Sequence, residues 1–357
     1  MNVNTPRCRR LAGIAAAAVL LGAVTACGGS ITPVGDQTPI PGISDELIEA
    51  ARQEGGVVLA AGGHTRDQLD LLESNFESRY GVSLTFNRAD SGSTVNAVNS
   101  ELASGKLNAD VVSLADAKAM QTWANDGVLT PVTIPNQDLI TDGLDTADSP
   151  QVPFAVVPLG IMYNSANTDE SEVPATWGDF AGSDQIAVTA DPRASGSALA
   201  FYTVMSEELG QDWAAQFGAR RPIVTESTLG LNQLVLTGEA DLGLPALEST
   251  VLTSANEGEP LSIAYPDGPV PATTLTVAAL AGAPHPKAAE LLLRYQLSDE
   301  FQKALGDNGT RGVLEGLPAP VGAPELAPDR IRTVLADDLI VRGDTVRAEF
   351  AAKVADQ

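Results

Sequence analysis

Cysteine, histidine and aromatic residues are all scarce in this 357-residue sequence. The two cysteines, Cys8 and Cys27, are too few for a disulfide framework. The two histidines, His64 and His285, exclude a metal site built from several histidines. Aromatic residues make up 4% of the chain, which argues against a surface of stacking platforms for nucleic-acid bases.

Positive charge is also scarce, because 21 Lys and Arg stand against 46 Asp and Glu, a net charge of -25. A general nucleic-acid binder needs a basic stripe that displaces phosphate counterions, so this balance excludes one. An anionic small ligand stays possible, since local dipoles can outweigh a screened global field. The composition, 44% hydrophobic and 19% charged, is globular, and the length predicts about two domains.

The N-terminal segment has the pattern of a secretory signal. Three arginines among the first ten residues precede an apolar run over 11–24, which is shorter than the roughly 20 residues of a membrane-spanning helix. Small residues then precede Cys27, an arrangement that resembles a bacterial lipobox, in which the cysteine receives diacylglycerol. An ordinary cleavage site beside an incidental cysteine is the alternative. We expect residues 1–26 to be a lipoprotein signal peptide and 27–43 a flexible linker.

The body of the chain alternates short apolar runs with amphipathic segments. Residues 57–60 and 110–114 suit buried strands, and apolar residues at spacings of three and four over 69–80 predict a helix between them. The same order returns after residue 186, and it is typical of parallel sheets covered by helices. Two extended apolar runs, 152–164 and 273–280, flank this second group and predict two crossings between two α/β lobes.

Three predicted turns between a strand and a helix carry Gly, Ser and Thr residues. Ligands bind parallel sheets outside the carboxyl ends of their strands, where helix N-termini offer free N–H groups and partial positive charge. Glycine lets a ligand approach the backbone, and Ser or Thr adds a hydroxyl donor. The candidate contacts are Gly63, His64, Ser91, Ser93, Thr94, Ser195, Gly196 and Ser197, with Arg193 as an oxyanion clamp or a solvated loop residue. Further possible contacts are Asp116, Ser227, Thr228 and Glu248, of which the two carboxylates could instead cap helices or face solvent.

Ordered landmarks extend over nearly the whole body, from about residue 47 to 305. They include "ELASGKLNADVVSLADAKAM", "PFAVVPLGIMYN", "PATWGDFAG", "ADPRASGSAL" and "LVLTGEADLGL". This series resembles the extracellular solute-binding proteins of ABC importers, in particular the ferric-iron-binding type. The resemblance implies a two-lobed periplasmic-binding-protein fold of type II, with two hinge crossings and a ligand cleft between the lobes. We expect 44–155 and 272–357 to form lobe 1 and 156–271 to form lobe 2.

The resemblance also bears on the ligand. Ferric members hold iron with a His, a Glu and a neighbouring Tyr pair; His64 falls at the His position and Asp116 near the Glu position, but 245–248 contains no tyrosine. Ferric iron needs hard anionic oxygen donors, so the metal half of the site looks degraded. The family's anion motif is matched by Ser195 and its neighbours. We therefore expect a small anion-bearing solute with His64 at the rim; a metal or amine ligand held by His64, Asp116 and Glu248 is the alternative.

The sequence also bears on the class of protein. The nucleophile elbow of α/β hydrolases, the HExxH motif and the P-loop are absent, so we expect a binding protein and not an enzyme. Two other classes stay open: a secreted hydrolase that uses His64 with a serine and an aspartate, and a ligand-sensing lipoprotein without transport. The expected partners are the solute, a membrane permease and a lipid anchor at the extracellular face of the membrane. We expect no cofactor, no nucleic acid and a monomer.

Overall fold

The computed structural model describes residues 38–141, 144, 149–334 and 336–355. The expected signal peptide, its Cys27 and most of the expected linker lie outside these residues. Within the described part of the chain, no helix combines the length and the apolar character needed to cross a membrane. The helices are α1 (Asp45–Glu54), α2 (Arg66–Tyr80), α3 (Ser91–Ser104), α4 (Ala117–Asn125), α5 (Trp177–Gly182), α6 (Gly196–Glu208), α7 (Gln211–Ala219), α8 (Leu231–Leu236), α9 (Glu248–Asn256), α10 (Pro286–Gln296), α11 (Asp299–Asp307) and α12 (Ala336–Phe350).

The strands fall into two groups that follow the predicted order. In the first group β1 pairs in parallel with β2 and β3, and in the second β6 pairs in parallel with β7 and β8. Helices α2 and α3 connect the strands of the first group, which confirms the strand and helix alternation read from the sequence. The strands are β1 (Gly56–Gly62), β2 (Ser83–Ala89), β3 (Val111–Leu114), β4 (Leu129–Thr130), β5 (Val152–Asn164), β6 (Ala187–Ala190), β7 (Ile223–Thr225), β8 (Leu242–Leu247), β9 (Leu261–Ala264), β10 (Val270–Leu280), β11 (Arg311–Gly312) and β12 (Ile331–Thr333).

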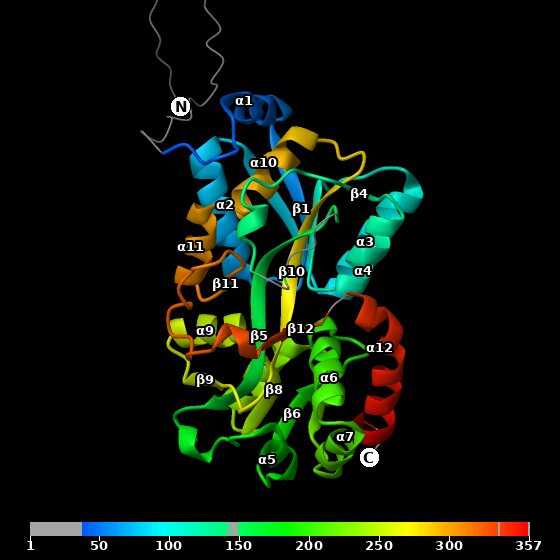
Figure 1. Ribbon diagram of the computed structural model, residues 1–357, viewed down its shortest axis with the longest axis vertical. Helices are drawn as coiled ribbons and strands as arrows, with labels where there is room; N and C mark the ends of the chain where they lie inside the picture. Colours follow the sequence, from blue (N-terminus) through cyan, green and yellow to red (C-terminus); the bar gives the residue numbers. More distant parts are fainter. Residues whose placement is uncertain (1–37, 142–143, 145–148, 335, 356–357) are drawn as a thin grey trace, which may run out of the picture. The chain divides into compact units, whose positions relative to one another are not determined.

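The long strands β5 and β10 join the two groups and run side by side in Figure 1. The first half of β5, through Pro158, pairs with β10, whereas its second half, from Leu159, pairs with β8 and β9. All of β5 is buried, which explains its continuous apolar run. Pro153 is tolerated in this central strand because the register shifts opposite it. Both expected crossings are therefore present; the lobe boundaries drawn from them remain predictions.

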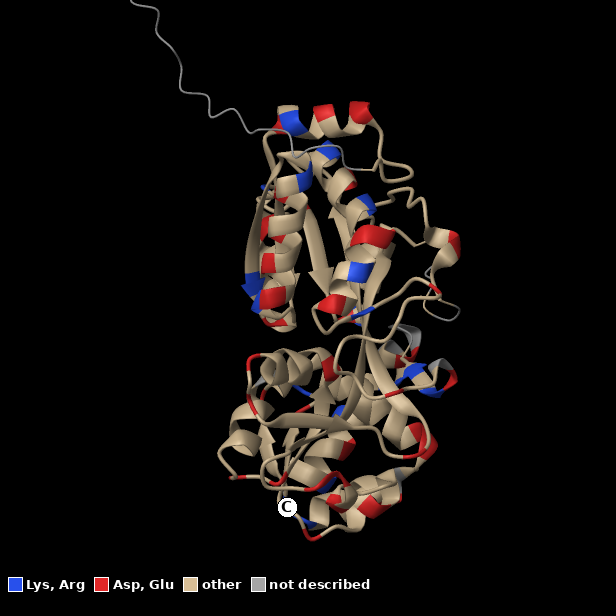
Figure 2. Cartoon of the chain, turned by 90° about the vertical axis from the view of Figure 1, so that its left-hand side faces the viewer, with Lys and Arg blue, Asp and Glu red and all other residues tan. Residues whose placement is uncertain are grey.

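The C-terminal helix α12 packs against α6 and also against α4 (Figure 1). The Phe350 ring lies 4.9 Å from the ring of Tyr202 on α6. The helix continues into a π-helical turn, Ala351–Ala355, that packs on α7. These contacts join the end of the chain, which the sequence assigned to lobe 1, to elements assigned to lobe 2. Carboxylates outnumber basic groups over the helices in Figure 2, in keeping with the net charge of -25.

Candidate functional site

Loops that follow the parallel strands meet at a cavity of about 270 Å³, here called the serine-lined cavity. The loops come after β1, β2 and β3 in one strand group and after β6 and β7 in the other, so the cavity lies at the carboxyl ends of the parallel strands. Segments that are more than 100 residues apart in the sequence thus contribute to one site. Its lining is Gly63, Asp90, Ser91, Ala115, Ala194, Ser195, Gly196, Ser197, Glu226, Ser227, Thr228 and Leu247.

Helix α6 presents its N-terminus to this cavity. Ser195 is the N-cap, and its hydroxyl accepts a hydrogen bond from the N–H of Ala198 at 3.2 Å. Within the described chain, no group accepts from the N–H groups of Gly196 and Ser197, and the first turn of α6 contains no acidic residue. The Ser197 side chain is 7% exposed and its hydroxyl makes no hydrogen bond to a described residue. The start of α6 therefore offers donors and partial positive charge to a ligand.

Helix α3 begins at the same cavity, but its N-cap is charged. The Asp90 carboxylate accepts from the N–H of Ser93 at 2.8 Å, and the hydroxyl and N–H of Ser93 lower the pKa of Asp90. The Thr94 hydroxyl donates to the Asp90 carbonyl oxygen at 3.0 Å. Ser93 and Thr94, both expected to contact the ligand, thus complete the start of α3 and are not among the residues that line the cavity, whereas Ser91 is.

His64 is buried and is not among the residues that line the cavity, so it does not lie at the rim, where it was expected. Its ring is 3% exposed, stacks on Phe154 at 5.9 Å between centroids, and places Nε2 3.1 Å from the Ser113 hydroxyl. Burial lowers the pKa of His64 to about 4, so the ring is neutral at pH 7. Ser113 is fully buried, and in the described residues no carboxylate contacts His64. The arrangement that a hydrolase would need is not formed around this pair.

Two other expected contacts are engaged elsewhere. The Arg193 guanidinium pairs with the Asp191 carboxylate through Nε at 2.9 Å and through a terminal nitrogen at 2.6 Å. The Asp116 carboxylate caps α4 and accepts from the N–H of Ala119 at 3.0 Å. Neither side chain lines the serine-lined cavity.

Glu248, the first residue of α9, is buried in an ion pair. Its carboxylate is 1% exposed and accepts from Nε of Arg311 at 2.8 Å, and the Tyr265 hydroxyl donates to the same carboxylate. Burial raises the pKa of Glu248, and the positive charge of Arg311 opposes this shift. His64, Asp116 and Glu248 are therefore not brought together as one ligand set. In the described part of the chain, no group of three or more His, Cys, Asp or Glu is placed to hold a metal ion.

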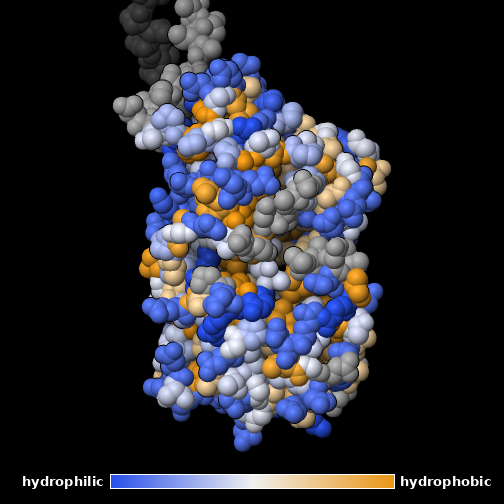
Figure 3. Space-filling model, in the orientation of Figure 1, coloured by the Kyte–Doolittle hydropathy of each residue, from blue (hydrophilic) through white to orange (hydrophobic). Residues whose placement is uncertain are grey.

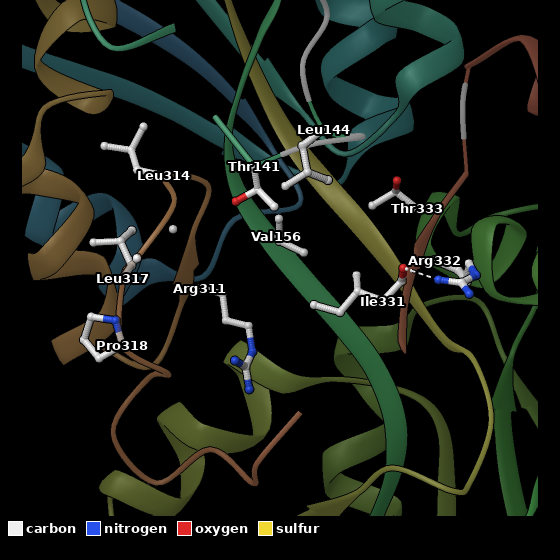
Figure 4. Close-up of a pocket in the computed structure, with 12 residues that line it drawn as sticks. Thr141, Leu144, Val156, Arg311, Leu314, Leu317, Pro318, Ile331, Arg332 and Thr333 are labelled. Carbon is white, nitrogen blue, oxygen red and sulfur yellow. Dashed lines mark hydrogen bonds between the residues drawn. The ribbon is translucent and has the colours of Figure 1, made fainter. Parts of the chain in front are cut away.

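A second cavity, of about 310 Å³, lies beside β5, β11 and β12 and is here called the Arg311 cavity. Figure 3 shows a hollow with hydrophobic residues near the middle of the face in view. Figure 4 shows Leu317 and Pro318 on one side and Val156 and Ile331 on the other, with the Arg311 guanidinium directed toward α9. Arg332 lines this cavity as well and donates to the Asp329 and Ile331 carbonyl oxygens, while Glu248 pairs with the Arg311 guanidinium. No helix begins among the described lining residues of this cavity, in contrast to the first one.

The structure adds lining residues that the sequence analysis did not select. Asp90 could have been found, because an aspartate directly before a helix start is a common N-cap. Glu226 follows β7, a strand of only three residues in which both apolar side chains, Ile223 and Val224, are exposed. The sequence therefore has no buried apolar run here that would predict a strand and the turn after it. Leu247, Ala115 and Ala194 carry no side-chain group that would mark a site. The sequence found the hydroxyl and glycine part of the lining and missed both of its carboxylates.

Comparisons with known proteins identify the family and the fold of this chain. The profile of the family described as bacterial extracellular solute-binding protein matches residues 57–311. No curated protein sequence matches the chain. Among solved structures, iron-bound HitA from Pseudomonas aeruginosa is 19% identical, with a TM-score of 0.70 over 83% of this chain and 99% of that one.

Two further structures have the same fold and are described with other ligands. AfuA from Actinobacillus pleuropneumoniae, with fructose-6-phosphate bound, is 18% identical, with a TM-score of 0.68 over 84% of this chain and 99% of that one. A periplasmic thiamin-binding protein is 16% identical, with a TM-score of 0.69 over 84% and 96%. The two-lobed periplasmic-binding-protein fold is thereby confirmed. With a family match that covers most of its length, this chain belongs to the bacterial extracellular solute-binding protein family.

Proposed function

We propose that this protein is the extracytoplasmic substrate-binding component of an ABC importer, which captures a small anion-bearing solute in the serine-lined cavity and delivers it to a membrane permease. Membership of the solute-binding family supports the capture of a solute. The similar structures are described as iron-bound, fructose-6-phosphate-bound and thiamin-binding, so the fold alone leaves the ligand open. The proposal includes no enzymatic activity, no cofactor and a monomeric protein.

The observation that carries the ligand class is the free N-terminus of α6. Gly196 and Ser197 line the cavity, and no described residue accepts a hydrogen bond from their N–H groups or from the Ser197 hydroxyl. A helix N-terminus carries roughly half a positive charge, which favours an anionic group at this position. Each charge-assisted hydrogen bond would contribute about 1.5–3 kcal/mol to binding.

The test is a screen of the protein by native mass spectrometry and thermal shift. Phosphate esters, phosphonates, sulfonates, carboxylates, polyamines and ferric iron are the probes, because a ligand of the folded state raises the melting temperature by mass action. Ser197→Ala should weaken binding of an anionic probe about tenfold or more, because it removes a donor that caps nothing. Ser104→Ala, at the far end of α3, is the control and should bind like the wild type.

The double variant Ser195→Ala and Ser197→Ala should abolish binding. Ser195 is also the N-cap of α6, so this variant should lose about 1 kcal/mol of folding stability as well. For this reason Ser197→Ala is the sharper test of the ligand site. Unchanged binding of every anionic probe by Ser197→Ala would contradict the proposed ligand site.

We further propose that Cys27 anchors the protein to the outer face of the cell membrane. The motive is the apolar run over 11–24 and the small residues that follow it directly before this cysteine. Cys27→Ala should release the protein into the medium or leave it unprocessed, as shown by fractionation of cells that produce it. Normal processing together with full membrane retention of the variant would contradict the anchor.

A further inference from the structure

The serine-lined cavity carries negative side-chain charge. The charged side chains of its described lining are the carboxylates of Asp90 and Glu226, and no Lys, Arg or His is among them. Helix N-termini and hydroxyls alone can hold a simple anion, but such an anion gains nothing from two carboxylates in the same lining. The lining therefore indicates a second requirement of the ligand besides its anionic group.

Asp90 changes what α3 can bind. Its carboxylate is the N-cap of α3 and accepts from the N–H of Ser93, so a negative charge already occupies the positive end of this helix. In the described chain, no Lys or Arg forms an ion pair with Asp90. The two helix N-termini of the cavity thus differ: α6, capped by the neutral Ser195, favours an anion, and α3 with its Asp90 favours a cation.

Glu226 adds a second carboxylate to the lining, and this one caps no helix. It lies in the turn after β7, its side chain is exposed, and no described residue gives it an ion pair or a hydrogen bond. A carboxylate without a partner in a cavity lined by hydroxyls is a natural contact for an ammonium group. Repulsion between two carboxylates of one lining is relieved when a cation binds beside them.

Two hydroxyls on largely buried residues independently indicate a polar ligand. The side chains of Ser197 and Thr228 are 7% and 5% exposed, both line the cavity, and neither hydroxyl bonds to a described residue. Neither hydroxyl oxygen is among the fully buried atoms of the described chain that lack a partner, so both oxygens are accessible from the cavity and free to contact a ligand. We infer that the partners here come from a ligand that lies between α6 and the turn after β7.

We propose that the solute is a zwitterion, with its anionic group at the N-terminus of α6 and an ammonium group beside Asp90 and Glu226. This inference rests on the proposed function and narrows its substrate class. A bare metal ion fits less well, because the lining supplies only two carboxylates, and the described residues contain no cluster of three or more metal-ligating side chains. An organic ammonium needs only hydrogen-bond acceptors and negative charge, and both are present.

The experiment compares probes that differ only in the ammonium group. Isothermal titration with the wild-type protein uses O-phosphoethanolamine against ethyl phosphate, taurine against ethanesulfonate and 4-aminobutyrate against butyrate. Asp90→Asn and Glu226→Gln are the variants, and Asp90→Asn retains a good N-cap for α3. Glu257→Gln, at an exposed position after α9, is the matched control. At least one zwitterion should bind about tenfold more tightly than the matching anion without an ammonium group. Asp90→Asn and Glu226→Gln should each lower the affinity for the zwitterion about tenfold and leave the affinity for the anion unchanged.

Several outcomes would overturn the inference. The zwitterion inference would be wrong if anions bound as tightly as their zwitterionic partners and lost no affinity in Asp90→Asn or Glu226→Gln. The proposed function would still stand in that case if Ser197→Ala weakened the binding of these anions. A different result would be that ferric or calcium ions bind more tightly than every amine and that this binding is lost in Asp90→Asn and Glu226→Gln. That result would show that the two carboxylates hold a metal ion and not an ammonium group. No binding by any probe of either kind would count against both the inference and the proposed ligand class.

Discussion

Removal of the Glu248 carboxylate should destabilise the fold strongly and leave ligand binding nearly unchanged. Glu248 is 1% exposed, and its partner Arg311 has a side chain that is 13% exposed. In Glu248→Ala the Arg311 guanidinium keeps only a 3.3 Å hydrogen bond to the Pro324 carbonyl oxygen, and the Tyr265 hydroxyl loses its acceptor. Loss of one partner of a buried ion pair costs about 3–5 kcal/mol, because the other charge stays buried without compensation.

The assay is thermal and urea unfolding of a double-mutant cycle. At about 2 °C per kcal/mol for a large domain, Glu248→Ala should lower the melting temperature by roughly 6–10 °C. Arg311→Met should cost a similar amount. Glu248→Ala combined with Arg311→Met should recover much of this loss, since no charge of the pair then stays buried without its partner.

Two results would refute this reasoning. Single variants that each cost less than about 1 kcal/mol, and that add in the double variant, would mean that the pair is weak and solvated. A loss of ligand affinity of about tenfold in Glu248→Ala, measured well below its melting temperature, would place the carboxylate in the ligand site. Such a loss would also revive the alternative in which Glu248 holds a metal or amine ligand.

Three further predictions concern stability. The folded-state pKa of His64, about 4, lies below its unfolded value of about 6.5, so stability that is present above pH 6.5 should be lost as the pH falls toward 4. The free energy of unfolding in urea should fall by about 2–3 kcal/mol less between pH 7 and pH 4.5 in His64→Gln than in the wild type. The same pH dependence in both proteins would contradict the buried neutral ring. Gly218→Ala would place a Cβ 1.6 Å from the Lys353 carbonyl oxygen, so it should free the C-terminal turn for proteolysis, whereas Gly182→Ala has open space and should behave as wild type. Asp110→Ala should lower the stability measured by thermal unfolding by about 3 kcal/mol. The reason is that this fully buried carboxylate accepts from the N–H of Val58 at 2.8 Å and from two nitrogens of His285. A cost below about 1 kcal/mol would show that water takes over the hydrogen bonds of the lost carboxylate.

The regular elements were predictable because their signals are local. Apolar runs mark β1, β5 and β10, and the three and four spacing marks α2, since each pattern records which face of one element is buried. The position of α12 was not predictable in this way. Its contact with α6 is made by residues almost 150 positions apart, Tyr202 and Phe350, and an irregular proline-rich segment precedes the helix.

The candidate site was predicted in part for the same reason. Ser195, Gly196 and Ser197 stand directly at a helix start, where local sequence indicates free N–H groups. The burial of His64 depends on Phe154, which is 90 residues away, and the pairing of Glu248 depends on Arg311, which is 63 residues away. No local pattern reports such contacts, so a histidine and a glutamate in favourable loops were indistinguishable from ligand contacts in the sequence.

The central claim, that the solute binds at the N-terminus of α6, is tested most directly by amide chemical shifts. A ¹⁵N- and ²H-labelled sample is titrated with the tightest-binding probe from the screen, and each backbone N–H is followed by TROSY spectra. A solute bound at the N-terminus of α6 should change the amide shifts of Gly196 and Ser197 most, with smaller changes at Ser91 and Ser227. Changes centred on Gly312 and Thr333 of the Arg311 cavity, with Gly196 and Ser197 unmoved, would contradict it.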